Sequence, residues 1–501
     1  MNKVKLFITA LLLLNMPVKA QNTETIKPEI KALYTTTETD LRDWMSYLTS
    51  PECRGRLTGD PGFFRAVNYT ANLFKEWGLE PGGDNGTYFQ NFPHPYTEVK
   101  EGAYFNLYVP VNKDWVAKDY PYPDHYMVGG TSDSGELKKL DLVYVGYGIT
   151  APELNYDDYK GIDVKGKIVV CERDVPYQGK DPKLQKSWTP YQYHNRKMTN
   201  AVEHGAAGML YVTVTGNPNP GWNKNFVYAC ISDSVATDIF AGTGKDHLTV
   251  KANIDKTLKP NSFPINKKAD IKAVTQYHPD GKGCNVIGIL RGSDPTLAPQ
   301  VIVAGGHIDH IGMMPVLMPG ALDNASGTVI VMGAAKALAQ SGYKPKRTLM
   351  FVLFGGEETG LIGSEYLASH PVVPNENIKA LINIDCLGTG YGLGARIAPK
   401  HSTLFNYFEK ANDTYVRRPF KALPGRDEII TRPRTDDANF FVKGVPTVSL
   451  FSFGATERTP YHHPGDVIEL IHFDIVKDAV KLLSETMIEM GDAPEIEATA
   501  R

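Results

Sequence analysis

The sequence predicts an α/β fold with a mostly parallel central sheet flanked by helices. Apolar runs rich in Val, Ile, Leu and Phe are typical of strands buried on both faces, and three such runs are Val301–Ala304, Thr348–Phe354 and Leu381–Ile384. Between the first two, Ser326–Gln340 has helical length and good helix formers, and Gly342 follows its end. A strand, a helix and a strand in this order predict a parallel βαβ unit.

Further elements are predicted on either side of this unit. The apolar residues of Phe63–Gly78 recur at the three-to-four spacing of an amphipathic helix. Similar patterns predict helices over Thr39–Thr49, Leu404–Asn412 and Phe473–Met490, and the apolar run Val445–Phe451 predicts another strand.

Residues 105–268 differ in character from the rest of the chain. Short β-type runs alternate there with turns, and one short helix is expected; these elements are Leu142–Ile149, Gly166–Cys171, Met209–Val214 and the helix Lys197–Gly205. We therefore predict a β-rich module inserted between residues 21–104 and 269–501, which form one larger domain. Since the module shows no suggestive set of acid, base and nucleophile, we expect it to have a non-catalytic role.

Composition narrows the class of protein. A chain of 501 residues with 42% hydrophobic content can bury a large core, and more than one domain is expected. The net charge is −3, and the absence of a long basic run argues against nucleic acid as a partner. The five cysteines are scattered and form no CxxC motif, which argues against a disulfide framework and a Cys-based zinc site. A bond between Cys171 and Cys230 is left open.

Residues 1–20 are typical of a secretory signal peptide. Lys3 and Lys5 precede the apolar run Leu6–Leu14, and the small residues Val18 and Ala20 fit a cleavage site near Ala20. The apolar run is too short to span a bilayer. We therefore expect no membrane span and export to the periplasm or the medium.

Polar residues stand just beyond the predicted strands and at the start of the predicted helix. In open α/β sheets, functional groups collect outside the carboxyl ends of the strands. Nitrogen and carboxylate oxygen together suit Zn²⁺ or a similar divalent ion. The candidates are His307, Asp309, Asp323, Glu357, Glu358, Asp385 and His462.

The residue types suggest how such a site would be divided. Two metal ions need a shared ligand, and a carboxylate such as that of Asp323 can bridge them, whereas a histidine cannot. Asp309 is placed to accept a hydrogen bond from the second ring nitrogen of His307. Of Glu357 and Glu358, one can bind metal while the other serves as a general base for water. Each residue alone has an ordinary structural explanation, but the complete set favours a metal site.

The ordered motifs resemble the M28 family of di-zinc exopeptidases, in particular secreted aminopeptidases with an inserted protease-associated (PA) domain. The matching segments of the main domain are GHIDHIG (306–312), GALDNASG (320–327), GGEETGLIGS (355–364), NID (383–385), TDDANF (435–440) and YHHPGD (461–466). The resemblance to a PA domain rests on VYVGYG (143–148), YDDYKGIDVKGKIVVC (156–171) and HGAAGMLYV (204–212).

The resemblance implies a zinc-exopeptidase-like fold and two divalent metal ions, with Zn²⁺ favoured. The implied roles are His307 and Asp385 on one metal, Glu358 and His462 on the other, Asp323 as bridge, Glu357 as general base, Asp309 as support for His307, and Tyr461 as stabiliser of the oxyanion. Because His463 stands where Thr is usual, it remains the alternative to His462 as the ligand.

The implied activity is the hydrolysis of N-terminal residues from peptides, through a metal-bridging water and a Glu general base. The alternatives are a glutamate-type carboxypeptidase, a glutaminyl cyclase with a single zinc, and a non-catalytic binding protein. A carboxypeptidase would need arginines for the terminal carboxylate, and the candidates are Arg426, Arg432 and Arg434.

Overall fold

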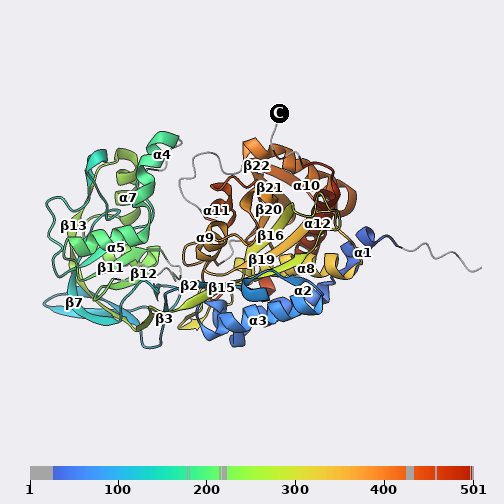
Figure 1. Cartoon of the computed structure of the whole chain (residues 1–501). Coiled ribbons are helices and arrows are strands. Elements are labelled where there is room, and N and C mark those ends of the chain that lie inside the picture. Colours follow the sequence, from blue (N-terminus) through green and yellow to red (C-terminus); the bar gives the residue numbers. More distant parts are fainter. Residues whose placement is uncertain are drawn as a thin grey trace, which may run out of the picture.

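The computed structural model describes residues 26–177, 179, 181–213, 216, 223–424, 434–456, 460–496 and 498 (Figure 1). The predicted signal peptide lies outside these residues. Two sheet-based units make up the described chain, and in Figure 1 the smaller one lies to the left of the larger one. No helix in these ranges combines the length and apolar character that crossing a bilayer requires.

The larger unit is built on a mixed sheet whose centre is parallel. The strands β19, β16, β20 and β23 are neighbours and pair in parallel, whereas β15 and β21 flank them antiparallel. In spatial order the strands are β1 (Glu80–Pro81), β15 (Lys282–Leu290), β19 (Thr348–Phe354), β16 (Val301–His307), β20 (Ile378–Ile384), β23 (Thr447–Phe453), β21 (Gly392–Ile397) and β22 (Phe420–Pro424), with β2 (Phe89–Pro93) also on β15.

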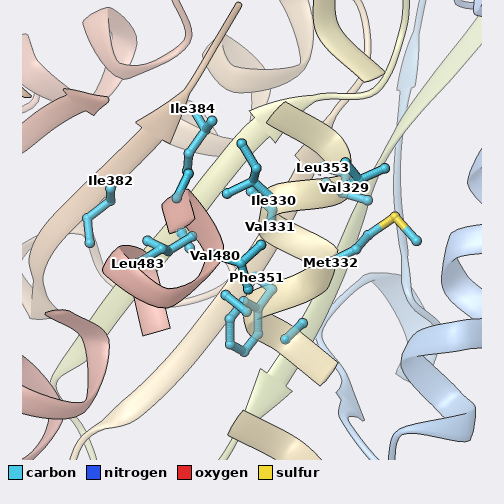
Figure 2. Close-up of a cluster of buried hydrophobic side chains, with 14 of the residues drawn as sticks. Val329, Ile330, Val331, Met332, Phe351, Leu353, Ile382, Ile384, Val480 and Leu483 are labelled. Carbon is cyan, nitrogen blue, oxygen red and sulfur yellow. The ribbon is translucent and has the colours of Figure 1, made fainter. Parts of the chain in front are cut away.

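Both faces of this sheet are covered by helices. Along β16, Ile302 and Ala304 face one core while Val301 and Val303 face the other, as the two-residue period of a strand requires. Figure 2 shows the first core, which brings apolar side chains of α8 together with Phe351 and Ile384. The helices of the unit are α1 (Pro28–Thr35), α2 (Glu38–Leu48), α3 (Pro61–Glu76), α8 (Ser326–Gln340), α9 (Ile362–Ser369), α10 (Phe405–Ala411), α11 (Asp437–Phe441) and α12 (Phe473–Asp492).

The smaller unit has its own sheet and its own apolar cores. Alternate residues of its central strands face two separate clusters of buried side chains. In spatial order its strands are β5 (Asp114–Asp119), β4 (Tyr104–Val111), β13 (Phe263–Ala273), β7 (Gly135–Tyr144), β10 (Ile168–Glu172), β11 (Gly208–Val212), β12 (Val227–Ile231) and β6 (Tyr126–Val128). Its helices are α4 (Pro182–Trp188), α5 (His194–Glu203), α6 (Asp233–Phe240) and α7 (His247–Thr257).

The chain enters and leaves the smaller unit through two paired strands. β3 (Tyr96–Val99) pairs antiparallel with β14 (Thr275–His278), so the two connections run side by side. The smaller unit is therefore an insertion into the larger one, between β2 and β15. Short two-stranded ladders are also formed by β8 (Thr150–Ala151) with β9 (Tyr156–Asp157), and by β17 (Met313–Met314) with β18 (Val316–Leu317).

The predicted α/β fold and the parallel βαβ unit are confirmed. Helix α8 has the predicted bounds, and β16 and β19 pair in parallel on either side of it in sequence. The inserted module is less purely β than expected, because α4, α6 and α7 were not predicted. The strand expected over Leu142–Ile149 ends at Tyr144, because Gly146 and Gly148 take positive φ angles of 49° and 65°.

The disulfide left open between Cys171 and Cys230 does not form, and both cysteines are free and buried. Cys171 pairs in register with Tyr211, which in turn pairs with Cys230, so a whole strand lies between them. Two strand spacings amount to about 9.5 Å, beyond the Cα separation that a disulfide can bridge.

Candidate metal centre

The predicted site residues converge at one edge of the larger sheet. His307 is the last residue of β16, Asp385 directly follows β20, and Glu357 and Glu358 follow β19. These three strands are neighbours and run in parallel, so their carboxyl ends meet at the same edge. Asp323 lies at the same edge, in the turn before α8. Its backbone is not helical there, with φ −110° and ψ 93°.

Asp323 lies between two imidazoles. Its Oδ1 is 3.4 Å from Nε2 of His307, and its Oδ2 is 3.2 Å from Nε2 of His462. Two groups of potential ligands share this carboxylate, and in each group the donor atoms lie within 4.8 Å of one another. One group is His307, Asp323 and Asp385, and the other is His310, Asp323, Glu358 and His462.

The two imidazoles differ in their partners but both aim Nε2 at carboxylates. Nε2 of His307 is 3.5 Å from Oδ1 of Asp385, and Nε2 of His462 is 2.8 Å from Oε2 of Glu358. Nε2 of His462 is buried and makes no hydrogen bond of acceptable geometry. A buried ring nitrogen that faces two carboxylate oxygens without a hydrogen bond fits a position for a cation.

Asp309 supports the site in a different way from the one predicted. Nδ1 of His307 donates to the backbone carbonyl of Asp309 at 3.1 Å, whereas the Asp309 carboxylate is 3.7 Å from that nitrogen. The carboxylate instead accepts from the backbone N–H groups of Glu357 and Glu358, at 3.2 and 3.4 Å. Asp309 thus orients His307 with its main chain and the two glutamates with its side chain.

The electrostatics of the cluster favour bound positive charge. Burial lowers the pKa of His462, but the charges and hydrogen bonds of Glu358 and Asp323 outweigh it and raise the pKa well above its usual value. Burial and the Asp323 charge act to raise the pKa of Glu358, yet His462 and His310 bring it down to about 2. Glu358 is therefore ionised, and the imidazole of His462 beside it attracts a proton or a metal ion.

Glu357 stands apart from this ionised set. Burial raises its pKa well above the ordinary value, opposed by His307 and reinforced by the charges of Glu358 and Asp385. A carboxylate with a raised pKa accepts a proton from water more readily than an ordinary one. Glu357 also lines the cavity beside the cluster, together with Tyr461.

The donor set fits zinc. Imidazole nitrogen and carboxylate oxygen are common zinc ligands, and a pair of ions needs one shared carboxylate. Each of the two groups offers both kinds of donor, and Asp323 belongs to both. Asp466 holds the turn of Asp323 in place by accepting from the backbone N–H groups of Leu322 and Asp323, at 2.8 and 3.0 Å.

Sequence reasoning missed His310 and Arg56. His310 is fully buried, and its Nδ1 donates to Oε1 of Glu358 at 2.7 Å. Arg56 is also fully buried and donates to the carbonyls of Leu48, Ile308, Pro319 and Gly320. The repeated histidine in GHIDHIG was a usable signal for His310, whereas three of the four partners of Arg56 lie more than 250 residues along the chain.

The two neighbours of His462 in sequence, Tyr461 and His463, have different surroundings from His462. His463 turns away from the cluster, and its Nε2 lies 3.1 Å from Oδ1 of Asp124 in the inserted unit. The ring of Tyr461 stacks on that of His462 with centroids 3.8 Å apart, and the residue is 51% exposed. Tyr461 lies on the wall of a cavity of about 920 Å³.

The cavity is shared by both units. Its lining includes residues of the cluster and Tyr461 from the larger unit, and Arg173, Tyr193 and Tyr211 from the inserted unit. Arg434, named above as a carboxylate-binding candidate, also lines it. Arg426 and Arg432 lie outside the described residues.

Two parts of the chain match the models of known protein families. Residues 285–487 match the model of peptidase family M28, and residues 138–246 match that of the PA domain. The domain that carries the cluster belongs to peptidase family M28. The M28 domain supplies every residue of the two ligand groups, and the PA domain supplies part of the lining of the cavity.

Curated relatives resemble this chain over part of their length. A probable zinc metalloprotease of Pyrenophora teres f. teres is 35% identical over 232 residues, 42% of this chain and 49% of the relative. A probable leucine aminopeptidase of Arthroderma otae is 26% identical over 214 residues, 41% of this chain and 57% of the relative. The matched stretches thus span about half the length of these relatives.

Solved structures share the whole architecture. The aminopeptidase from Aneurinibacillus sp. strain AM-1 aligns with 94% of this chain and 98% of its own, with a TM-score of 0.65 and 18% sequence identity. This likeness shows that the two chains share the same overall fold.

Proposed function

We propose that this chain is a metal-dependent aminopeptidase that binds two zinc ions. The single observation that carries the proposal is the position of Asp323, whose two carboxylate oxygens face His307 and His462 from within two ligand groups. That arrangement fits a carboxylate shared by two ions. The names of the relatives, a probable zinc metalloprotease and a probable leucine aminopeptidase, favour zinc as the metal and peptide N-termini as the substrate.

Under this proposal each residue has a defined task. His307 and Asp385 would hold one ion, Glu358 and His462 would hold the other, and Asp323 would be a ligand of both. When bound, the two ions would lower the pKa of a water molecule and polarise the scissile carbonyl. Glu357 takes the proton of the attacking water and passes it to the leaving amine. The Tyr461 hydroxyl donates to the oxyanion as it develops.

The protein's wider organisation is part of the proposal. We infer that residues 21–104 and 269–501 form the catalytic domain and that residues 105–268 form the insertion, supported by the separate sheet and cores of the latter. We also infer export, with cleavage near Ala20, from the charged start and short apolar run of residues 1–20.

The test is a panel of aminoacyl anilides assayed with and without a metal chelator. The proposal predicts hydrolysis of substrates with a free N-terminal amine, little hydrolysis of their N-acetylated forms, and recovery of chelated enzyme on addition of zinc. Release of the C-terminal residue from an N-acetylated peptide would instead indicate a carboxypeptidase. Absence of chelator-sensitive hydrolysis across the panel would favour a binding protein.

A further inference from the structure

The PA domain makes a direct contact with a candidate metal ligand. Nδ1 of His462 donates to the carbonyl oxygen of Gly216 at 2.9 Å, and the Gly216 N–H donates to the carbonyl of His462 at 3.1 Å. The two residues are separated by 246 positions in the chain. Gly216 belongs to the insertion, so this pair of hydrogen bonds joins the two domains at the edge of the cluster.

This contact determines how His462 presents its ring. Because a carbonyl can only accept, Nδ1 must carry the hydrogen, and in the neutral ring the lone pair then lies on Nε2. Nε2 is the atom that faces Glu358 and Asp323. A hydrogen bond to the second nitrogen of a ligand histidine fixes both the tautomer and the ring orientation.

The backbone of His462 also needs external support. His462 has φ of 49°, in the left-handed region that residues with a side chain adopt at a cost. Such conformations persist where the surroundings impose them, and they cluster at functional sites. Gly216 holds both the main chain and the side chain of this one residue.

A second segment with candidate ligands is fixed by the same domain. The loop that follows His307 places Ile311, Met314 and Met318 in an apolar cluster that consists mainly of PA-domain residues, and all three are buried. His463, next to His462, is paired with Asp124 of the PA domain. The loop that follows His307 and the loop that carries His462 are therefore both packed against the insertion.

We propose that the PA domain is a positioning part of the metal centre, acting through Gly216 on His462. This inference rests on the proposed function and adds to it. Under this proposal the insertion not only lines the cavity but also orients the imidazole of His462, which would bind the second ion. The effect of Gly216 falls on the ion that Glu358 and His462 would hold, since Gly216 makes no contact with His307 or Asp385 among the described interactions.

Close packing at Gly216 supplies a way to disturb the contact. A Cβ added there would lie 2.5 Å from Cδ1 of Ile311 and 2.9 Å from Sδ of Met314. Gly216→Ala therefore displaces the carbonyl or its neighbours, and Gly216→Val displaces them further. Ile311→Val removes the nearest obstructing atom and serves as the relief substitution. Gly135→Ala is the matched control, because its Cβ would meet Val227 at 3.1 Å within the PA domain.

The experiment measures the two stepwise zinc affinities of the full-length protein by competition with a chromophoric chelator. The unfolding temperature of the metal-free protein is recorded alongside. We expect Gly216→Ala to weaken one ion by about 10-fold, in the range found when a partner of a ligand histidine is lost, and Gly216→Val to weaken it further. The other ion should change by less than about 2-fold, and Ile311→Val should restore much of the loss in Gly216→Ala.

Each outcome decides between the proposals. Stepwise affinities of Gly216→Ala and Gly216→Val equal to those of the parent would overturn the inference and leave the proposed function standing. A second outcome would be an equal loss of affinity for both ions, seen also in Gly135→Ala and accompanied by a lower unfolding temperature. This outcome would show that Gly216 acts only in folding, and it would also overturn the inference. A parent protein that binds no zinc would overturn the proposed function, and the inference with it.

Discussion

Nδ1 of His310 lies 2.7 Å from Oε1 of Glu358. The other oxygen of this carboxylate, Oε2, faces His462, so a second imidazole contacts the carboxylate. Glu358 is thereby clamped between two histidines, one on each oxygen. Because His310 is fully buried, this contact is shielded from solvent. The two contacts hold the Glu358 carboxylate within the ligand cluster.

Replacing His310 should weaken zinc binding. In His310→Ala the carboxylate of Glu358 loses its fixed orientation, and we expect a loss of about 10- to 100-fold in affinity for one ion. Zinc titration of the purified variant measures this. His401→Ala is the matched control, since His401 is a buried histidine of the same domain outside the cluster. If both variants bind zinc equally well, the role given to His310 is wrong.

Glu357→Gln should separate metal binding from turnover. The substitution keeps the shape of the side chain but removes the proton acceptor, so kcat should fall by about 10³-fold. Zinc content should stay at the parental value, because Glu357 has no ligand task. Metal analysis and single-turnover kinetics on one preparation check both halves. A variant that keeps near-parental kcat would exclude Glu357 as the general base.

Arg56→Met should destabilise the fold. The guanidinium satisfies four backbone carbonyls in a fully buried position, and the substitution leaves these acceptors without partners. We expect a loss of at least about 3 kcal/mol in unfolding free energy. Arg65→Met is the control, because Arg65 is exposed and makes one such bond, to Glu52. Urea unfolding of the two variants should differ strongly, and similar midpoints would refute the argument.

Stability should also respond to pH through Glu485. Burial, reinforced by the charge of Glu489, raises the pKa of Glu485 from 4.5 to about 7. Between these values the folded protein keeps a proton that the unfolded chain has lost, so this group lowers stability as the pH rises from about 4.5 to about 7.

Glu485→Gln removes that penalty. We expect the variant to be more stable than the parent by about 1–3 kcal/mol at pH 8, with the gain vanishing near pH 4. Thermal or urea unfolding across this range measures the difference, with the exposed Glu409→Gln as control. A gain that does not depend on pH would contradict the assignment.

The strands and the ligand cluster could be predicted because their signals are local. Strand β19 has the predicted bounds since its apolar run is continuous and buried on both faces. The candidate ligands His307, Glu358 and Asp385 follow such runs, and parallel pairing brings the ends of these strands together. The short helices α6 and α7 were missed although capping residues mark their starts, with Ser232 accepting from Val235 N–H and Asp246 from Thr249 N–H.

The supporting contacts could not be predicted from the sequence. Most partners of Arg56, such as Gly320, lie far away in the chain, and so does Gly216 from His462. The residue types at these positions do not indicate that the pairs are in contact. The role of Asp309 was also misjudged, since spacing could not tell its carbonyl from its carboxylate as the partner of His307. The positions of polar residues after predicted strands reveal candidate ligands, but they do not reveal the contacts that orient these ligands.

The central claim is that two ions share Asp323. Anomalous diffraction from crystals grown with zinc, measured at the zinc edge, tests it most directly. We predict two peaks about 3.5–4 Å apart, one beside His307 and Asp385 and the other beside Glu358 and His462, with Asp323 between them. A map with no peak at this carboxylate, or with zinc only at sites remote from it, would contradict the account.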